Sequence, residues 1–251
     1  MDNIEKFTNK VDNYVKYRPG YPQEFIDYLS NELGFSNSSV SADIGAGTGI
    51  LTRSVAKIVK TLYAVEPNNK MRSACEKGCK NYKNVISING SAEETTLQDN
   101  SIDFITVAQA FHWFDKLNCL KEFKRILKPE NKVVLVWNRK AADDPFIRKS
   151  SELYKKYCPD YKGIAGNSDL SPEHYNDFFK NKTCDYRIFD NDLLLSLDNY
   201  IGGVLSASYA LQESDPNYKE FTDKLMELFH KYSKQEKLLL NNKTHSYAGQ
   251  V

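Results

Sequence analysis

Acidic residues and glycines that follow predicted strands are the residues of this sequence best placed to do chemistry. Gly45, Gly47 and Gly49 alternate within SADIGAGTG, and Asp43 stands two residues before the first of them. Glycines let the backbone approach a ligand closely, because no Cβ stands in the way. A pyrophosphate site has the spacing G-x-G-x-x-G, and a carboxylate beside it would repel phosphate. The spacing G-x-G-x-G after an acid therefore favours a ligand with an ammonium group and no phosphate.

A second acid and a polar turn predict the rest of a nucleoside site. Glu66 lies in LYAVEP, 21 residues after Gly45, where a carboxylate can accept hydrogen bonds from both ribose hydroxyls. Ser91, Ala92 and Glu93 follow the next apolar run and would border an adenine ring. The three features together favour a nucleoside that carries an amino acid.

The elements that must position these residues alternate between short apolar runs and helical periods. Strands that alternate with helices form a parallel, doubly wound sheet, and ligands bind beyond the carboxyl ends of its strands. The glycine turn and Glu66 both fall at such ends. We expect strands at 40–44, 61–65, 85–89, 102–108 and 132–137, and helices at 23–33, 50–59, 68–80 and 116–127.

The chain changes character after Trp137. Polar and aromatic residues fill 143–182, with helices expected after Asp144-Pro145 and Ser171-Pro172, and we interpret this segment as a helical cap insertion over the ligand site. A sixth strand is expected at 186–196, helices at 198–211 and 216–232, and then a final strand or hairpin. We expect a single domain over 1–251, with an N-terminal lid and helix (1–34), a ligand-binding core (40–140), the cap, and a C-terminal part (184–251) that completes the fold.

The composition limits the partners of this chain. Its 34 basic and 33 acidic residues give a net charge of +1, so no sequence-wide field would hold nucleic acid or anionic lipid. We expect no membrane span and no signal peptide, and hence a cytoplasmic protein that is a monomer or homodimer. The five cysteines lack CxxC spacing, which argues against a disulfide framework and against a metal site.

Four ordered motifs carry a family resemblance. DIGAGTG (43–49), VEPNNKM (65–71), GSAEE (90–94) and DFITVAQAFHWFD (103–115) resemble the successive motifs of class I S-adenosylmethionine-dependent methyltransferases. FTNKVDNYVKYRPGYP and AFHWFD further resemble the small-molecule branch that includes trans-aconitate methyltransferase-like proteins. The resemblance implies an α/β fold with a doubly wound, seven-stranded, mostly parallel Rossmann-like sheet whose last strand is antiparallel. It also implies S-adenosyl-L-methionine as the cofactor.

The resemblance assigns a role in donor binding to each motif. The loop would flank the methionine moiety, the acid after the second strand would hold the ribose, and Asp43 would act on the donor amino group directly or through water. Met71 and Ala92 have an alternative role, which is to fill the core. The expected donor-binding residues are Asp43, Gly45, Ala46, Gly47, Thr48, Gly49, Glu66, Pro67, Met71, Ser91, Ala92, Glu93, Gln109, Ala110 and Trp113.

Three further residues are candidates for positioning the methyl acceptor. Methyl transfer is an in-line displacement, which depends on positioning and on exclusion of water, and a carboxylate acceptor needs no general base. His112 would act as a base or a hydrogen-bond donor, Arg18 would clamp a carboxylate, and Tyr209 resembles a family position that faces the acceptor. Their alternatives are a loop-packing histidine, a surface ion pair and a buried helical aromatic. Arg139, just past the fifth strand, is a further candidate at the ligand end.

We therefore expect a methyltransferase for a small-molecule acceptor, with O-methylation of a carboxylic acid as the leading reaction. Action on nucleic acid or protein is the first alternative, disfavoured by the near-neutral charge and by AQAF where a base-methylating enzyme would have [N/D]-P-P-[Y/F]. An NAD-dependent oxidoreductase is disfavoured by the glycine spacing. A non-catalytic donor-binding protein is disfavoured because Asp43, the glycine turn and Glu66 are all present.

Overall fold

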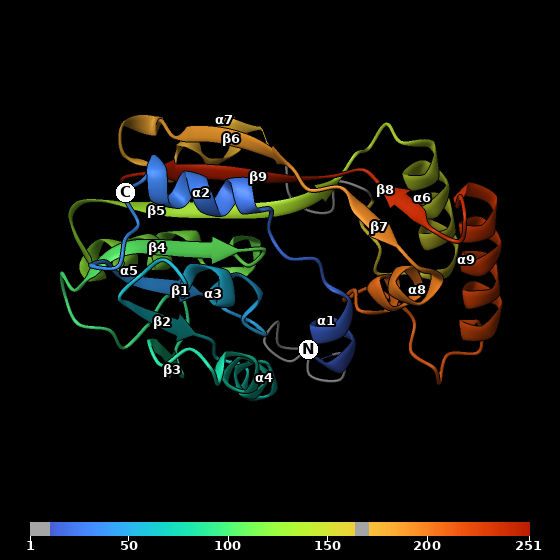
Figure 1. Cartoon of the computed structure of the whole chain (residues 1–251), viewed down its shortest axis with the longest axis horizontal. Coiled ribbons are helices and arrows are strands. Elements are labelled where there is room, and N and C mark those ends of the chain that lie inside the picture. Colours follow the sequence, from blue (N-terminus) through green and yellow to red (C-terminus); the bar gives the residue numbers. More distant parts are fainter. Residues whose placement is uncertain (1–10, 164–170) are drawn as a thin grey trace.

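A seven-stranded sheet forms the centre of the molecule. The computed structural model describes residues 11–163 and 171–251. Strands β1 to β5 pair in parallel, whereas β9 runs antiparallel to both β5 and β6, in the order β3-β2-β1-β4-β5-β9-β6 (Figure 1). The predicted mostly parallel sheet with an antiparallel last strand is thereby confirmed. Its strands are β1 (Val40–Ile44), β2 (Thr61–Val65), β3 (Val85–Ile88), β4 (Ile102–Ala108), β5 (Leu127–Lys140), β6 (Asp185–Asp190) and β9 (Asn242–Gly249).

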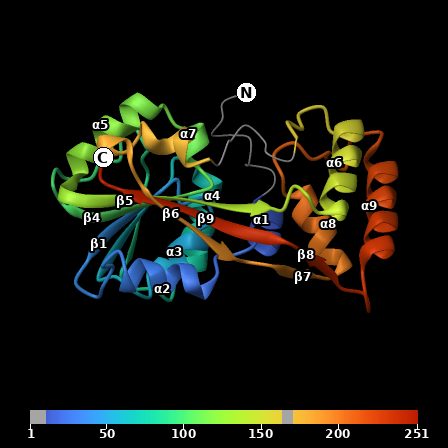
Figure 2. The ribbon, with the colours of Figure 1, turned by 90° about the horizontal axis from the view of Figure 1, so that it is seen from above.

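Helices cover both faces of this sheet, because the side chains of a buried strand point alternately to the two sides. In β5, Val133, Leu135 and Trp137 pack into one apolar cluster, and Val134 and Val136 into the other. Figure 2 shows the two layers, with α2 and α3 on one side and α5 and α7 on the other. The helices around the sheet are α2 (Gln23–Asn31), α3 (Ile50–Val55), α4 (Asn69–Cys79), α5 (Lys116–Ile126) and α7 (Pro172–Asn176).

A third apolar cluster builds a helical cap beyond the carboxyl end of β5 (Figure 1). Phe146, Tyr200, Phe221 and Phe229 lie in this cluster, and none of them is more than 3% exposed. The cap consists of α6 (Pro145–Tyr157), β7 (Leu193–Leu195), α8 (Leu197–Leu205), α9 (Tyr218–Tyr232) and β8 (Leu238–Leu240).

We expected residues 143–182 to form the cap. In the structure, part of this segment packs on the sheet, and later segments supply most of the cap. Of the described part of that segment, α6 packs in the cap together with Cys158 and Tyr161, which follow it. Tyr175 of α7 instead lies 4.8 Å from Trp137 of β5, measured between ring centroids, and Phe178 belongs to the same sheet cluster. The expected C-terminal helices, α8 and α9, form most of the cap. Aromatic side chains on α7 and just after it decide this placement, because they complete the apolar layer over Trp137.

Two strands differ in length from the sequence-based expectation. β5 continues to Lys140 rather than ending at Trp137, since it pairs with β9 as far as Lys140–Asn242. The expected strand 186–196 is interrupted at Asn191, and its parts enter different sheets. The Asn191 side-chain amide donates hydrogen bonds to Asn138 Oδ1 and Thr244 Oγ1 at 3.1 and 3.2 Å, which holds the chain where it leaves the main sheet.

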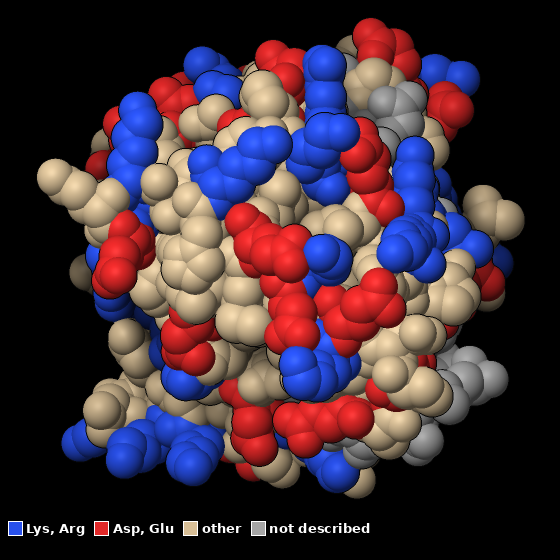
Figure 3. Space-filling model, turned by 90° about the vertical axis from the view of Figure 1, so that its right-hand side faces the viewer, with Lys and Arg blue, Asp and Glu red and all other residues tan. Residues whose placement is uncertain are grey.

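The short helix α1 (Val11–Tyr17) lies at the junction of sheet and cap (Figure 2). It contacts α8, where the Tyr17 hydroxyl donates to the Asp198 carboxylate at 3.1 Å and Lys16 pairs with the same group at 3.3 Å. It also contacts α4. Across residues 11–163 and 171–251, no helix combines the length and apolar character needed to cross a bilayer. On the cap side of the molecule, acidic and basic side chains are interspersed (Figure 3).

Candidate functional site

The glycine turn between β1 and α3 is packed at both ends and open in the middle. Gly45, Gly47 and Gly49 have φ angles of 69°, 57° and 77°, a region that favours glycine. A Cβ at Gly45 would lie 2.7 Å from Ala110 Cβ, and one at Gly49 would lie 2.7 Å from Cys75 Sγ. A Cβ at Gly47 would meet nothing within 4 Å. The outer glycines thus permit close packing, and the middle one presents bare backbone to a ligand.

Asp43 lies beneath this turn and is only 1% exposed. Its carboxylate accepts hydrogen bonds from Thr52 Oγ1 at 2.6 Å and from Thr106 Oγ1 at 2.9 Å. Burial raises the pKa of Asp43 to about 6, although the two hydroxyl groups oppose the shift. In this arrangement Asp43 ties β1 to α3 and β4, and any effect on a ligand amino group is indirect.

Glu66 connects the turn to the start of α4. Its carboxylate accepts from the Gly47 and Asn68 backbone N–H groups, both at 2.9 Å. Burial raises the pKa of Glu66, and the two backbone hydrogen bonds act against this rise. Each oxygen has a further lone pair, so the group can still accept from two hydroxyls of a ligand. Its position beside the open Gly47 suits a ribose.

Pro67 precedes the N-cap residue of α4, and Met71 lies in the first turn of that helix. Asn68 caps α4 by accepting from the Met71 N–H at 3.0 Å. Met71 is 5% exposed, which agrees with the alternative that it fills the core. The Arg72 guanidinium donates to the carbonyl oxygens of Glu66 and Pro67 at 2.8 and 3.2 Å, and so fixes the backbone of this turn.

The turn after β3 is tied to the start of α5. Ser91 Oγ accepts from the Glu93 N–H at 3.2 Å, and Glu93 Oε1 accepts from the Asp115 N–H at 2.9 Å. Ala92 is 3% exposed and packs in the sheet cluster, again in agreement with its alternative role. The Glu93 bond brings the loops after β3 and β4 together, as a site for an adenine ring requires.

The loop after β4 begins with a strained residue. Gln109 has a φ of 56°, a conformation that costs a side-chain-bearing residue about 1–3 kcal/mol and that clusters at functional sites. Its backbone N–H donates to Val136 O at 2.9 Å, and its side-chain amide donates to Asn138 O at 3.2 Å. Ala110 then packs against Gly45. Gln109 is thereby held between the glycine turn and the end of β5.

His112 and Trp113 lie in a short 3-10 helix (Phe111–Trp113) anchored by the buried Phe111. Their rings pack together with centroids 4.7 Å apart. The protein around His112 and, secondly, the charge of Arg139 lower its pKa to about 4, although the residue keeps exposed surface. Neither His112 nor Trp113 lines the cavity between the sheet and the cap.

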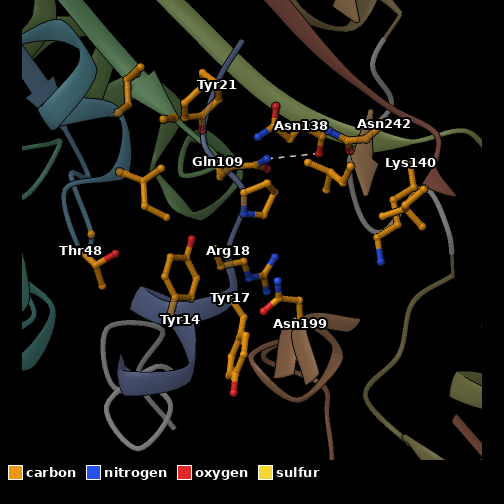
Figure 4. A pocket seen from close by; sticks show the side chains of 18 of the residues that line it. Tyr14, Tyr17, Arg18, Tyr21, Thr48, Gln109, Asn138, Lys140, Asn199 and Asn242 are labelled. Carbon is orange, nitrogen blue, oxygen red and sulfur yellow. Dashed lines mark hydrogen bonds between the residues drawn. The ribbon is translucent and has the colours of Figure 1, made fainter. Parts of the chain in front are cut away.

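That cavity has a volume of about 150 Å³ and is lined by the glycine turn, α1, the ends of β4 and β5, and the cap (Figure 4). It brings together several residues singled out from the sequence, namely Arg18, Gly45, Ala46, Gly47, Thr48 and Gln109. Tyr14, Tyr17 and Tyr21 of the N-terminal segment also line it. The N-terminal segment and the cap therefore meet over the glycine turn.

Two cationic side chains and no acidic ones are found among the described residues that line the cavity. Arg18 donates from Nη2 to Ser206 O at 3.4 Å, and its guanidinium lies 5.0 Å from the Tyr14 ring centroid. Its buried Nε has no hydrogen-bond partner among the residues that the structure describes. Lys140 has accessible surface in the cavity, but the surrounding protein and, secondly, Arg18 lower its pKa to about 8. The cavity is therefore suited to an anion.

Asn138, Lys140, Asn199 and Asn242 are lining residues that the sequence-based candidates did not include. Alternation along β5 explains the first two, because Asn138 and Lys140 share one face and Arg139 points to the other. Arg139 instead lies close enough to His112 and His245 to lower the pKa of each. If the fifth strand had been predicted to run to residue 140, the alternation of its side chains would have identified Lys140 as a residue that faces the ligand site.

Tyr209 belongs to the cap and does not line the cavity. Its ring packs against those of Tyr154 and Tyr161, with centroids 5.8 and 4.9 Å apart. Burial raises its pKa. These contacts agree with the alternative of a buried aromatic.

Comparisons with known proteins place the chain in a family. Residues 42–135 match a family model described as a methyltransferase domain. An uncharacterised methyltransferase-like protein of Schizosaccharomyces pombe is 35% identical over 175 residues, which cover 68% of this chain and 67% of that protein. An uncharacterised methyltransferase of the same yeast is 34% identical over 151 residues, 60% of this chain and 59% of the relative. The chain thus spans about three fifths to two thirds of these relatives.

A solved structure shows the same fold over nearly the whole chain. A candidate type II methyltransferase from Anaeromyxobacter dehalogenans superposes with a TM-score of 0.68 and 17% identity, covering 93% of this chain and 98% of that one. The strand order, with β1 at the point where it reverses and an antiparallel last strand, agrees with that likeness. The chain belongs to the class I S-adenosylmethionine-dependent methyltransferases.

Proposed function

We propose that this protein transfers a methyl group from S-adenosylmethionine to a carboxylate of a small acceptor, forming a methyl ester. The observation that carries the proposal is the cavity beside the glycine turn, where Arg18 and Lys140 are present and no described lining residue is acidic. The motifs that resemble trans-aconitate methyltransferase-like proteins favour the same class of acceptor.

The residues around the glycine turn fit the donor. Gly47 offers bare backbone, and Glu66 lies beside it with free acceptor capacity for the ribose hydroxyls. Pro67, Met71, Ser91, Ala92 and Glu93 would border the adenosine. The glycine turn, with Gln109 and Ala110, would flank the methionine part, and Trp113 would stand outside as a wall. When bound, S-adenosylmethionine supplies a methyl group made electrophilic by a sulfonium.

The chain's own contribution to the reaction is positioning and exclusion of water. Arg18 would hold the acceptor carboxylate through charge-assisted hydrogen bonds, since its Nε is buried and has no partner within residues 11–163 and 171–251. Tyr14 and Tyr21 would close the cavity over the reacting groups. A carboxylate attacks without losing a proton, so no general base is needed.

The described lining residues argue against an acceptor that must be deprotonated. They include no histidine and no carboxylate, and Lys140, with a pKa of about 8, is mostly protonated at pH 7. We assign His112 a packing role beside Trp113, and Tyr209 a role in building the cap. Nucleic acid is a poor fit as well, because the chain carries a net charge of only +1.

Two experiments test the proposal. Calorimetry should detect binding of S-adenosylmethionine and show no heat with NADH. Incubation with methyl-labelled donor and a panel of small carboxylic acids should then give a labelled product. Mild base should release the label from this product, because base hydrolyses methyl esters. The same protein should not label alcohols, amines, oligonucleotides or protein. Donor binding together with labelling of an amine or a polymer, and of no acid, would contradict the carboxylate acceptor.

A further inference from the structure

The carbonyl oxygen of Gly20, in the connection between α1 and α2, is held by two asparagine side chains. Asn138 of β5 and Asn191, which follows β6, each donate a side-chain amide hydrogen bond to this oxygen at 3.0 Å. Arg18 and Tyr21, which stand before and after Gly20, both line the cavity. Two donors on one carbonyl oxygen therefore fix the backbone where the chain carries these two side chains into the cavity.

The Asn138 amide is oriented by the partners of its oxygen. Asn138 Oδ1 accepts from Thr244 Oγ1 at 2.6 Å and from Asn191 Nδ2 at 3.1 Å. Thr244 lies opposite Asn138 in the pairing of β5 with β9 and is 0% exposed, so it holds this oxygen in place. A side-chain amide accepts at its oxygen and donates at its nitrogen. With the oxygen occupied, the NH₂ group of Asn138 faces Gly20.

Asn138 also contacts the loop after β4. Its backbone carbonyl oxygen accepts from Gln109 Nε2 at 3.2 Å (Figure 4, dashed line). Gln109 precedes Ala110, which packs against Gly45 of the glycine turn. One residue of β5 thus joins two walls of the cavity: its main chain holds the loop beside the glycine turn, and its side chain holds the N-terminal segment.

Arg18 lies between two anchors on different parts of the molecule. Before it, the Tyr17 hydroxyl donates to Asp198 of the cap at 3.1 Å. After it, Gly20 is held from the sheet side by the two asparagines. The guanidinium itself donates to Ser206 O of the cap at 3.4 Å, which is long for an N–H···O hydrogen bond. Because the glycine turn belongs to the sheet part, the place of Arg18 relative to that turn depends on the Gly20 anchor.

We propose that Asn138 is a positioning residue for methyl transfer, which acts with Asn191 by holding the Gly20 carbonyl and so sets Arg18 and Tyr21 opposite the glycine turn. This role does not depend on which acceptor is methylated, and so goes beyond the proposed function. A hydrogen bond between neutral groups shifts an equilibrium about 2- to 10-fold, so the loss of one of the two bonds should loosen the segment and leave the protein folded.

The test is the mobility of this segment in the full chain, measured as NMR order parameters of the Gly20 and Tyr21 backbone amides. These should be about 0.85 in the wild type and fall below about 0.6 in Asn138→Ala. Asn138→Asp should give the same fall at neutral pH, because a carboxylate has the shape of the amide but cannot donate to Gly20. Asn191→Ala should also loosen the segment, since it removes the other donor. S-adenosylhomocysteine should dissociate about 2- to 10-fold faster from both Asn138 variants, because the loosened segment no longer covers the glycine turn.

Asn84→Ala is the matched control. The Asn84 side-chain amide likewise donates to two carbonyl oxygens, those of Ala56 and Val59, at 2.8 and 2.9 Å, but Asn84 does not line the cavity. Its substitution should lower stability toward urea and leave the order parameters and S-adenosylhomocysteine dissociation at their wild-type values.

Three results would each overturn the positioning role. They are unchanged order parameters in the Asn138 variants, loosening in Asn138→Ala but not in Asn138→Asp, and equal loosening in Asn84→Ala. The second result would assign the effect to packing rather than to the hydrogen bond. A loosened segment with unchanged S-adenosylhomocysteine dissociation would also overturn the role, because the segment would then not act on the donor site.

Discussion

Asp43 and Glu66, the two carboxylates beside the glycine turn, accept hydrogen bonds from different kinds of donor. Asp43 accepts from two hydroxyl groups of the protein, and its burial is nearly complete. Glu66 accepts from two backbone N–H groups, those of Gly47 and Asn68, beside the open glycine turn. At the scale of single residues, Asp43 therefore joins neighbouring elements, whereas Glu66 is placed to meet a ligand.

Replacing Asp43 should remove a pH dependence of stability. Its folded pKa of about 6 lies above the ordinary value of 3.8, so between these values the folded state binds a proton that the unfolded state has released. This contribution to stability is present at low pH and is lost as the pH rises through about 6. The unfolding free energy of Asp43→Asn minus that of the wild type should therefore rise by about 2–3 kcal/mol from pH 4 to 7.5.

Urea unfolding at a series of pH values measures this difference. Asp12→Asn is the control, because Asp12 is exposed on α1 and its substitution should give a curve parallel to that of the wild type. A parallel curve for Asp43→Asn as well would mean that Asp43 does not bind its proton in the folded state.

Replacing Glu66 should affect the donor site. In Glu66→Gln, the amide NH₂ would face the backbone N–H of either Gly47 or Asn68. Both groups are hydrogen-bond donors, so one of the two hydrogen bonds would be lost. Affinity for S-adenosylhomocysteine should fall about 10-fold or more, since a charged hydrogen-bond acceptor for the ribose is lost as well. Calorimetry measures the change, with the exposed Glu94→Gln as the control. Unchanged affinity would remove Glu66 from the ribose site.

Helix α1 depends on α8 for its position. No residue of α1 is buried, so its own sequence gives it little reason to form a stable helix. Tyr17 packs where Gly202 of α8 has no side chain, and its hydroxyl reaches Asp198. At the scale of elements, the absence of a side chain at Gly202 thus leaves the space in which Tyr17 of α1 packs against the cap.

Gly202→Ala should therefore release α1. Its Cβ would overlap the Tyr17 ring, whereas a Cβ at the adjacent Gly203 would lie 3.8 Å from Tyr17 O, at ordinary contact distance. Both changes raise helix propensity by about 1 kcal/mol, so only the contact differs. Tryptic cleavage after Lys16 should become several-fold faster in Gly202→Ala and stay near the wild-type rate in Gly203→Ala. Equal rates in the two variants would show that α1 is not held by this contact.

The whole molecule has separate apolar cores in the sheet and in the cap, and the cavity lies where these two parts meet. The glycine turn and Gln109 come from the sheet side, Tyr200 and Val204 come from the cap, and α1 closes the space between. Donor and acceptor would thus be held by different parts of the chain, and methyl transfer would require both parts to be in place.

Damage to the cap core should spare donor binding. Phe221 and Phe123 are both 0% exposed, the first in the cap cluster and the second in the sheet cluster. Truncation of either to alanine costs about 3–5 kcal/mol. In Phe221→Ala, hydrogen exchange should increase in α6 and α9 and not in β1 and β4, and S-adenosylhomocysteine should still bind. Phe123→Ala should raise exchange in the sheet and weaken that binding. Uniform changes in both variants would mean that the two cores unfold together.

Several features of this protein follow from the sequence by itself. The alternation of apolar runs and helical periods predicts a parallel sheet, because each element's pattern is local. The glycine spacing, Asp43 and Glu66 predict a donor site, because residues that follow parallel strands gather at one edge of the sheet. The short strands, the starts of α4, α5 and α6 and the antiparallel last strand agree with those expectations.

Only the tertiary structure decided what meets the donor site. Whether Arg139 or Lys140 enters the cavity depends on how far β5 pairs with β9, and one residue along a strand reverses the direction of the side chain. The placement of α7 on the sheet and of Tyr209 in the cap depends on apolar partners far away in the sequence. The donor motifs are determined by local spacing, whereas the acceptor cavity is formed by long-range packing, which no single segment of the sequence specifies.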